Sequence, residues 1–226
     1  MKKIVVIGSS NTDMVVQSDH LPTPGETILG DQFIMNPGGK GANQAVAAAK
    51  LDGDVTFIAR VGHDMFGQEA LKGFQSHQIH TDYIISDEKN PSGIALIMVD
   101  DKGENCISVA LGANAALSSS DIDQAEAIIE QAAFGLIQLE IPIETVSHAV
   151  AKLHQLGVKV TLNPAPAQAL NDELLASLYC ITPNESEAEI LTGVKVIDEK
   201  TPNDNFKINQ KSILNKIFQL AKKENE

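Results

Sequence analysis

The chain has 226 residues, of which 43% are hydrophobic and 21% charged, as in an ordinary globular protein with one or at most two domains. Its formal net charge of −13 argues against a nucleic-acid or anionic-membrane partner, because both attract basic surfaces. The two cysteines show neither metal-ligand spacing nor a disulfide framework, and no apolar stretch is long enough to span a bilayer. We therefore expect a cytoplasmic protein.

Short apolar runs alternate with segments rich in helix formers along most of the chain. We expect strands at 3–7, 55–59, 136–141, 158–162 and 179–182, and helices at 42–51, 67–77, 119–133, 143–156 and 184–192. Strands that alternate with helices predict an α/β fold, in which helices cover both faces of a parallel sheet. Another amphipathic helix is expected at 206–221, and a further strand should then follow it.

Two segments interrupt this alternation. Residues 12–35 are rich in proline and glycine between short alternating runs, and residues 92–110 are expected to form a β-hairpin around DDKGEN. We predict that both segments form a small antiparallel β sheet inserted into the α/β domain. Such a sheet suits a lid, and its exposed apolar area suits a homodimer interface.

The glycine cluster GGKGAN, at 38–43, opens a predicted helix. Glycines let the backbone approach a ligand closely, and the first N–H groups of a helix are unpaired donors. The spacing is that of neither a P-loop nor a dinucleotide fingerprint, since Gln44 stands where the latter needs glycine or alanine. A tight turn into a closely packed helix explains the cluster about equally well. Lys40 and Asn43 favour a ligand, because they add a cation and an amide.

Polar residues also follow two of the predicted strands. Asn11 and Asp13 come just after the first strand and, being two apart on an extended segment, should point to one side. An ionised aspartate can accept hydrogen bonds from the hydroxyls of a polyol, although turn capping is the simpler explanation of this motif alone. Glu140 ends an apolar strand, where a carboxylate needs a partner or solvent, so that a ligand crevice and a salt bridge are both compatible with it.

The segment PNESE, at 183–187, lies at a strand-to-helix junction. Asn184 and Glu187 have capping-box spacing, and a helix beginning here needs such a cap. A carboxylate at this point could also hold a hydrated Mg²⁺ through its waters, and both roles are compatible with the same residues.

Taken together, these segments resemble the ribokinase family of carbohydrate kinases. The matching segments run in family order over residues 1 to about 195: GSSNTDMV, PTPGET, NPGGKGANQAVAAAKL, VGHDMFG, GENCISVALGANAAL, LIQLEIP, LNPAPA and ITPNESEAEILTG. The resemblance implies the family's fold, with a β lid that is also the dimer interface. It implies transfer of the ATP γ-phosphoryl group to the 5-hydroxyl of D-ribose, with Mg²⁺ and a monovalent cation (K⁺) as cofactors.

The resemblance also implies roles for individual residues. Asn184 would contact the nucleotide, and Glu187 would serve Mg²⁺. The residues implied to bind the sugar are Asn11, Thr12, Asp13, Gly39, Lys40, Gly41, Ala42, Asn43 and Glu140.

The sequence departs from the family pattern in the segment G-x-G-D, which carries the Asp that accepts the hydroxyl proton. Residues 1–226 contain no such segment, and the expected ATP-contacting strand–turn and monovalent-cation loops are absent too. We therefore expect a single incomplete, C-terminally truncated ribokinase-like domain without a catalytic base, and undetectable phosphorylation by this polypeptide. The alternatives are a non-catalytic ribose-binding or dimerising fragment, or a kinase of another sugar or a nucleoside.

Overall fold

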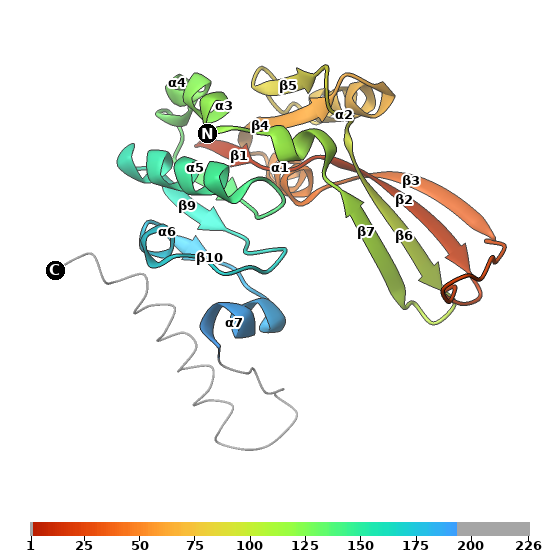
Figure 1. Ribbon diagram of the computed structural model, residues 1–226. Helices are drawn as coiled ribbons and strands as arrows, with labels where there is room; N and C mark the ends of the chain where they lie inside the picture. Colours follow the sequence, from red (N-terminus) through yellow and green to blue (C-terminus); the bar gives the residue numbers. More distant parts are fainter. Residues whose placement is uncertain (1, 194–226) are drawn as a thin grey trace.

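The computed structural model describes residues 2–193, and the helix expected at 206–221 lies outside them. Within this range, six strands form a parallel sheet in the order β10-β9-β8-β1-β4-β5 (Figure 1). The strands are β1 (Lys3–Ile7), β4 (Asp54–Gly62), β5 (Ile84–Asp87), β8 (Phe134–Ile137), β9 (Lys159–Leu162) and β10 (Cys180–Ile181). Their pairings are all parallel, which confirms the predicted α/β fold class.

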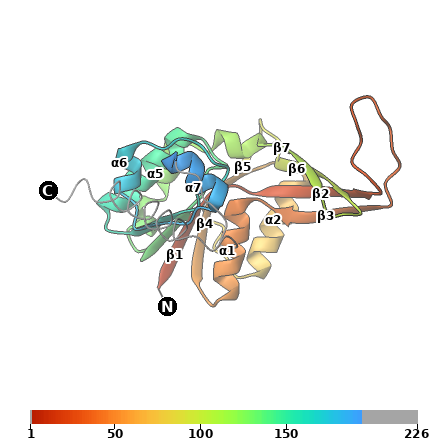
Figure 2. The same ribbon diagram turned by 90° about the horizontal axis from the view of Figure 1, so that it is seen from below.

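Apolar side chains on both faces of the strands explain why helices cover the sheet on both sides. Val5 and Ile7 belong to one buried cluster, whereas Val6 between them belongs to the other, as the two-residue period of a strand requires. The helices are α1 (Lys40–Lys50), α2 (Met65–Ser76), α3 (Ser119–Gln124), α4 (Glu126–Ile129), α5 (Ile143–Gln155), α6 (Asp172–Ala176) and α7 (Glu185–Thr192). Figure 2 shows α1 and α2 on one side of β1 and β4, with α5 and α6 on the other.

A second sheet, which we call the lid, projects from the body (Figures 1 and 2). Its strands, in the order β3-β2-β6-β7, are β2 (Asn11–Ser18), β3 (Gln32–Gly38), β6 (Gly93–Asp100) and β7 (Asn105–Ala110). The expected hairpin is β6–β7, but the sheet is mixed rather than antiparallel, because β2 and β6 pair in parallel. Both strands leave the body in the same direction, and each then folds back through its own antiparallel partner.

Two expected elements differ from the structure. The helix expected at 119–133 is divided into α3 and α4, because Ala125 leaves helical geometry with ψ near 4°. The strand expected at 136–141 ends at Ile137, and the following Leu139 N–H donates to the Ala165 carbonyl, beyond the end of β9. Glu140 therefore lies in the loop after β8. The 3₁₀ helix η1 (Gly112–Ala116), β5 and α6 were not predicted.

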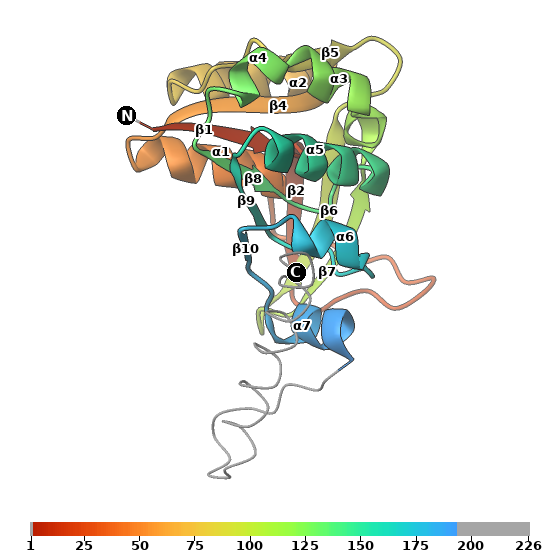
Figure 3. The same cartoon turned by 90° about the vertical axis from the view of Figure 1, so that its left-hand side faces the viewer.

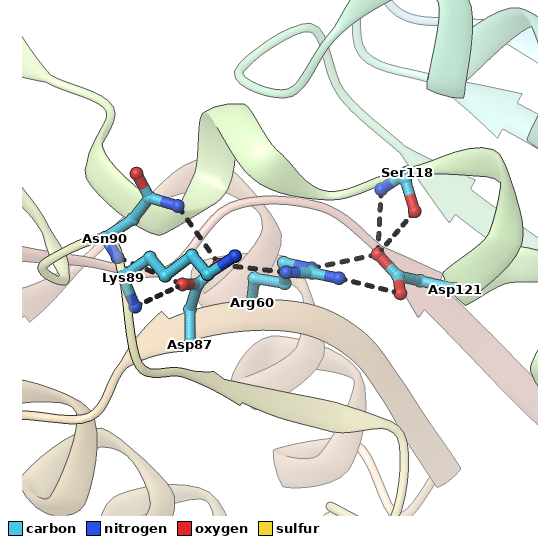
Figure 4. A network of polar contacts seen from close by, with 6 residues as sticks. All are labelled: Arg60, Asp87, Lys89, Asn90, Ser118 and Asp121. Atoms are coloured by element: carbon cyan, nitrogen blue, oxygen red, sulfur yellow. Dashed lines mark hydrogen bonds and ion pairs between the residues drawn. The ribbon is translucent and has the colours of Figure 1, made fainter.

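A buried ionic network joins β4 to the two segments beside it (Figure 4). The Arg60 guanidinium donates to both oxygens of Asp121, at 2.9 and 3.0 Å, and to Asp87 at 2.8 Å. Each carboxylate also accepts hydrogen bonds from residues close to it in the chain: Asp87 from Lys89 and Asn90, and Asp121 from Ser118, the N-cap of α3. Since Asp87 and Asp121 are buried, this network satisfies charges that would otherwise be costly.

The network shifts the pKa values of its members. The backbone N–H groups of Lys89 and Asn90 hold the pKa of Asp87 well below its usual range, with a smaller contribution from Arg60. Burial by itself raises the pKa of Asp121, but hydrogen bonds from Arg60 and Ser118 outweigh it, and the pKa of Asp121 is lowered. Both carboxylates are therefore ionised at neutral pH.

Candidate functional site

The candidate site lies where the lid leaves the main sheet. Strands β1 and β8 are parallel neighbours, so their carboxyl ends meet at one edge, where ligands of open α/β sheets bind. The end of β1 continues through residues 8–10 into β2 of the lid, and the end of β8 leads to Glu140. This topology brings Asn11 and Glu140 to the same edge, as expected from the polar residues that follow these strands.

Glu140 is held at the beginning of α1. Its Oε2 atom accepts a 2.6 Å hydrogen bond from the Ser9 hydroxyl and a 3.0 Å bond from the Lys40 backbone N–H. The Lys40 ammonium lies 3.8 Å from Oε1, and the Gly41 N–H donates to Ser9 Oγ at 3.3 Å. The helix N-terminus, a serine and a cation therefore compensate the charge of Glu140.

The carboxylate of Asp13, unlike that of Glu140, has no such set of hydrogen-bond donors within residues 2–193. Its carboxylate lies against Gly38, where a Cβ atom would come within 2.1 Å of Asp13 Oδ1. Burial raises the pKa of Asp13, the nearby Glu140 charge raises it further, and Lys40 lowers it. No residue within 2–193 donates a hydrogen bond to this carboxylate, so its oxygens are available to a ligand with hydroxyl groups.

Asn11 and Thr12 point to opposite sides of β2. Asn11 is buried and shares its face with Asp13, as the two-residue spacing predicts. Thr12 alternates to the other face, opposite Pro37 and Ile94 in the neighbouring strands. The structure thus brings Asn11 and Asp13 together but does not bring the Thr12 side chain to them.

Close packing accounts for part of the glycine cluster. Gly39 has φ +91°, and a Cβ at Gly41 would lie 2.5 Å from the Ser9 nitrogen, so both positions need glycine. Ala42 is buried, and its N–H donates to the Ser9 carbonyl at 2.8 Å. The side chains of Lys40 and Asn43, one helical turn apart, reach solvent and remain available for binding.

Asn184 and Glu187 form the predicted capping box of α7. Asn184 Oδ1 accepts from the Glu187 N–H at 2.8 Å, and Glu187 accepts from the Asn184 backbone and side chain at 2.9 and 3.0 Å. They follow β10, which is separated from β8 by one strand of the parallel sheet (Figure 3). Residues 2–193 contain no group of three acidic, histidine or cysteine side chains that could hold a metal ion.

Two residues of this site escaped the sequence analysis. Ser9 connects Glu140 to α1, and Asn114 in η1 donates a 2.7 Å hydrogen bond to Asn11. Ser9 lies inside the motif that drew attention to Asn11, so its place at the end of β1 was a usable signal. Asn114 carries no local signal, because its partners lie more than 100 residues earlier in the chain.

A parallel sheet, a projecting second sheet and a polar site at their junction are the features of the ribokinase-like fold. The structure of Arabidopsis thaliana ribokinase complexed with ribose and ATP superposes with a TM-score of 0.82 at 31% identity, covering 97% of this chain and 69% of that one. The sequence profile described as pfkB family carbohydrate kinase matches residues 1–219. The chain therefore belongs to the pfkB family of carbohydrate kinases.

Curated relatives agree with this assignment. The ribokinase of Haemophilus influenzae is 46% identical over 200 residues, which cover 88% of this chain and 65% of that protein. The deoxyribokinase of Salmonella typhi is 41% identical over 197 residues, covering 85% and 63%. The chain thus spans less than two thirds of the length of these two relatives.

None of the helices within residues 2–193 is long and apolar enough to cross a membrane.

Proposed function

We propose that this chain is a ribokinase-type domain that binds D-ribose at the junction of sheet and lid. Its family reaction would be transfer of the ATP γ-phosphoryl group to the ribose 5-hydroxyl, giving D-ribose 5-phosphate. The observation that carries the proposal is the partly buried Asp13 carboxylate, which has no hydrogen-bond donor within residues 2–193 and lies beside Lys40 and Glu140. The similarity to ribokinases supports the choice of sugar.

In this proposal the sugar contacts come from β2, the loop after β8 and the beginning of α1. Asn11 and Asp13 would bind ring hydroxyls, and Glu140, held by Ser9 and the helix start, would complete the sugar pocket. The remaining contacts would come from the side chains of Lys40 and Asn43 and from the backbone of Thr12, Gly39, Gly41 and Ala42. The lid segments, about 12–35 and 92–110, would close over the bound sugar.

We further propose that ATP lies toward β10, with Asn184 near its phosphates. A dedicated protein cage for Mg²⁺ does not fit residues 2–193, but a single carboxylate that contacts the waters of a phosphate-bound Mg²⁺ does. Glu187 offers this carboxylate, since each of its oxygens keeps a lone pair beyond the capping bonds. The monovalent-cation requirement stays a prediction.

Titration calorimetry of the 226-residue chain with D-ribose tests the sugar site. We expect heat of binding that disappears in Asp13→Ala and persists in the control Asp31→Ala, an exposed aspartate elsewhere on the lid. A folded sample that releases no heat would remove the proposal. Ribose and 2-deoxyribose should be compared in the same experiment, because the deoxyribokinase similarity makes 2-deoxyribose the second candidate.

Phosphoryl transfer is a separate question. Residues 1–226 contain no G-x-G-D segment, so we propose that the acceptor of the hydroxyl proton is not among them. ATP-dependent ribose phosphorylation by this polypeptide alone should therefore be undetectable in a coupled ADP assay. Robust turnover would show that one of these residues serves as the base.

We also propose that the lid mediates a homodimer. The register places Ile34, Val15, Ile97 and Ile107 in one row across its four strands, on the Asp13 face, and Ile107 is 53% exposed. Sedimentation velocity should show a dimer that Ile107→Lys dissociates, whereas Leu51→Lys, at an exposed site after α1, leaves it intact. A monomeric wild-type chain would contradict this proposal.

We propose a cytoplasmic location as well. Cys106 and Cys180 are exposed and unpaired, and a reducing compartment would keep them as thiols.

A further inference from the structure

Asn114 is a fully buried amide that contacts the junction between β1 and β2. Its side chain is 0% exposed and makes three hydrogen bonds. Its Oδ1 accepts from the Ser10 backbone N–H at 2.9 Å, and its Nδ2 donates to the Ser10 carbonyl at 3.1 Å and to Asn11 Oδ1 at 2.7 Å. Every polar atom of this side chain is therefore paired with the segment that carries Asn11 and Asp13.

The backbone of Ser10 determines which way the Asn114 amide points. A backbone N–H can only donate and a carbonyl can only accept, so Oδ1 of Asn114 must face the first and Nδ2 the second. The second hydrogen of this NH₂ group then points at Asn11. It needs an acceptor, so Asn11 must turn its own Oδ1 inward and its NH₂ group outward.

The outward NH₂ group of Asn11 is not used by the protein. No residue within 2–193 accepts a hydrogen bond from it. Within residues 2–193, the fully buried side-chain polar atom without a hydrogen-bond partner is Gln138 Oε1, not the Asn11 nitrogen. The unpaired Asn11 NH₂ group is therefore accessible to solvent. Gly93 packs directly against the hydrogen bond between Asn11 and Asn114, since a Cβ there would lie 2.3 Å from both Asn11 Oδ1 and Asn114 Nδ2.

We propose that Asn114 is a positioning residue that makes Asn11 a hydrogen-bond donor toward the sugar. Asn11 then donates and Asp13, on the same face of β2, accepts, which is the pairing that a hydroxyl group satisfies because it accepts one bond and donates another. The identity of the ligand rests on the proposed function. The orientation of the Asn11 amide does not, and it can be measured without a ligand.

Side-chain amide NMR of the full chain labelled with ¹⁵N-asparagine tests the orientation directly. We expect the Asn114 NH₂ protons to be protected from solvent exchange, and the Asn11 NH₂ protons to exchange freely and to shift on addition of ribose. An Asn11 NH₂ group as protected as that of Asn114 would overturn the inference, whether or not ribose binds. Free exchange at Asn11 without any response to ribose would uphold the orientation and count against the ribose site.

A double-mutant cycle tests whether Asn114 acts through Asn11. In Asn114→Asp an oxygen replaces the NH₂ group, so Asn11 should turn to donate inward and present its oxygen to the sugar. We expect ribose affinity to fall at least about tenfold in Asn114→Asp and in Asn11→Ala, with the double variant no weaker than Asn11→Ala alone. Additive losses would show that Asn114 does not act through Asn11.

Thr145→Val provides a matched control for lost stability. It removes a buried 2.8 Å hydrogen bond from Thr145 to the Leu117 carbonyl, just after η1, without touching Asn11. This variant should lower the melting temperature and leave the ribose dissociation constant unchanged. If Thr145→Val lost as much ribose affinity as Asn114→Asp, the role of Asn114 would be structural only. If Asn114→Asp does not fold, the amide measurement on the wild-type chain still decides the proposal.

Discussion

Ser9 and Glu140 lie 131 residues apart in the sequence, yet the Ser9 hydroxyl donates a 2.6 Å hydrogen bond to the Glu140 carboxylate. The same hydroxyl accepts from the Gly41 N–H, so one buried side chain joins the segment after β1, the loop after β8 and α1. The proposed sugar site thus depends on a contact among three segments that only the parallel sheet brings together.

Replacing this serine should weaken both the fold and the site. Ser9→Ala leaves the Gly41 N–H without an acceptor and removes one donor from Glu140, so we expect the free energy of unfolding to fall by about 1–2 kcal/mol. Ribose affinity should fall several-fold, because Glu140 is less firmly held. Urea unfolding and calorimetry measure the two effects. Ser147→Ala, which loses a local bond to the Ile143 carbonyl within α5, should leave affinity unchanged.

Asp13→Asn should separate stability from binding. Since burial raises the pKa of Asp13 above its unfolded value, its ionised form is less favourable in the folded state than in the unfolded chain. Asp13 therefore stabilises the folded state below its unfolded pKa, and this stabilisation is lost as the pH rises through its folded pKa. At pH 7 the variant should therefore unfold at higher urea than the wild type while losing at least about tenfold in ribose affinity. The gain in stability should shrink toward pH 4, and a variant less stable at pH 7 would contradict this account.

Arg60→Met should be strongly destabilising. Methionine keeps much of the side-chain volume but leaves Asp87 and Asp121 as buried carboxylates without their cation, so we expect a loss of about 3 kcal/mol in the free energy of unfolding. The control is Lys152→Met, which removes ion pairs with Asp123 and Glu126 on the surface. Its effect should be much smaller, because solvent screens such pairs. Equal losses in the two variants would show that the Arg60 network contributes no more to the free energy of unfolding than surface ion pairs do.

The same network predicts a loss of stability in acid. The pKa values of Asp87 and Asp121 are lowered in the folded state, so their contribution is present above the ordinary aspartate pKa of about 4 and is lost as the pH falls below it. Urea unfolding between pH 7 and pH 3 should show a steep decline below about pH 4. Arg60→Met should decline less, because part of the shift at both carboxylates comes from Arg60. An equal slope in both proteins would contradict this assignment.

Much of the fold follows from local sequence pattern. The alternation of Val5, Val6 and Ile7 between two apolar faces, and the capping pair Asn184 and Glu187, are properties of neighbouring residues, so both strands and helix starts were predicted close to their observed places. The break at Ala125 was not, because helix formers flank it on both sides. The parallel pairing of β2 with β6 also escaped prediction, since it joins segments about 80 residues apart.

By itself the sequence determined the fold class, the polar residues at the strand ends and the kinase family, because periodicity and ordered motifs are local and survive without coordinates. Only the tertiary structure decided which polar groups are already paired and which remain for a ligand. Glu140 is paired with Ser9 and Lys40, whereas Asp13 is left without a donor among the described residues, and Asn114 turns the Asn11 amide outward. The reason is physical: hydrogen bonds between segments more than 100 residues apart exist only once the sheet has brought those segments together.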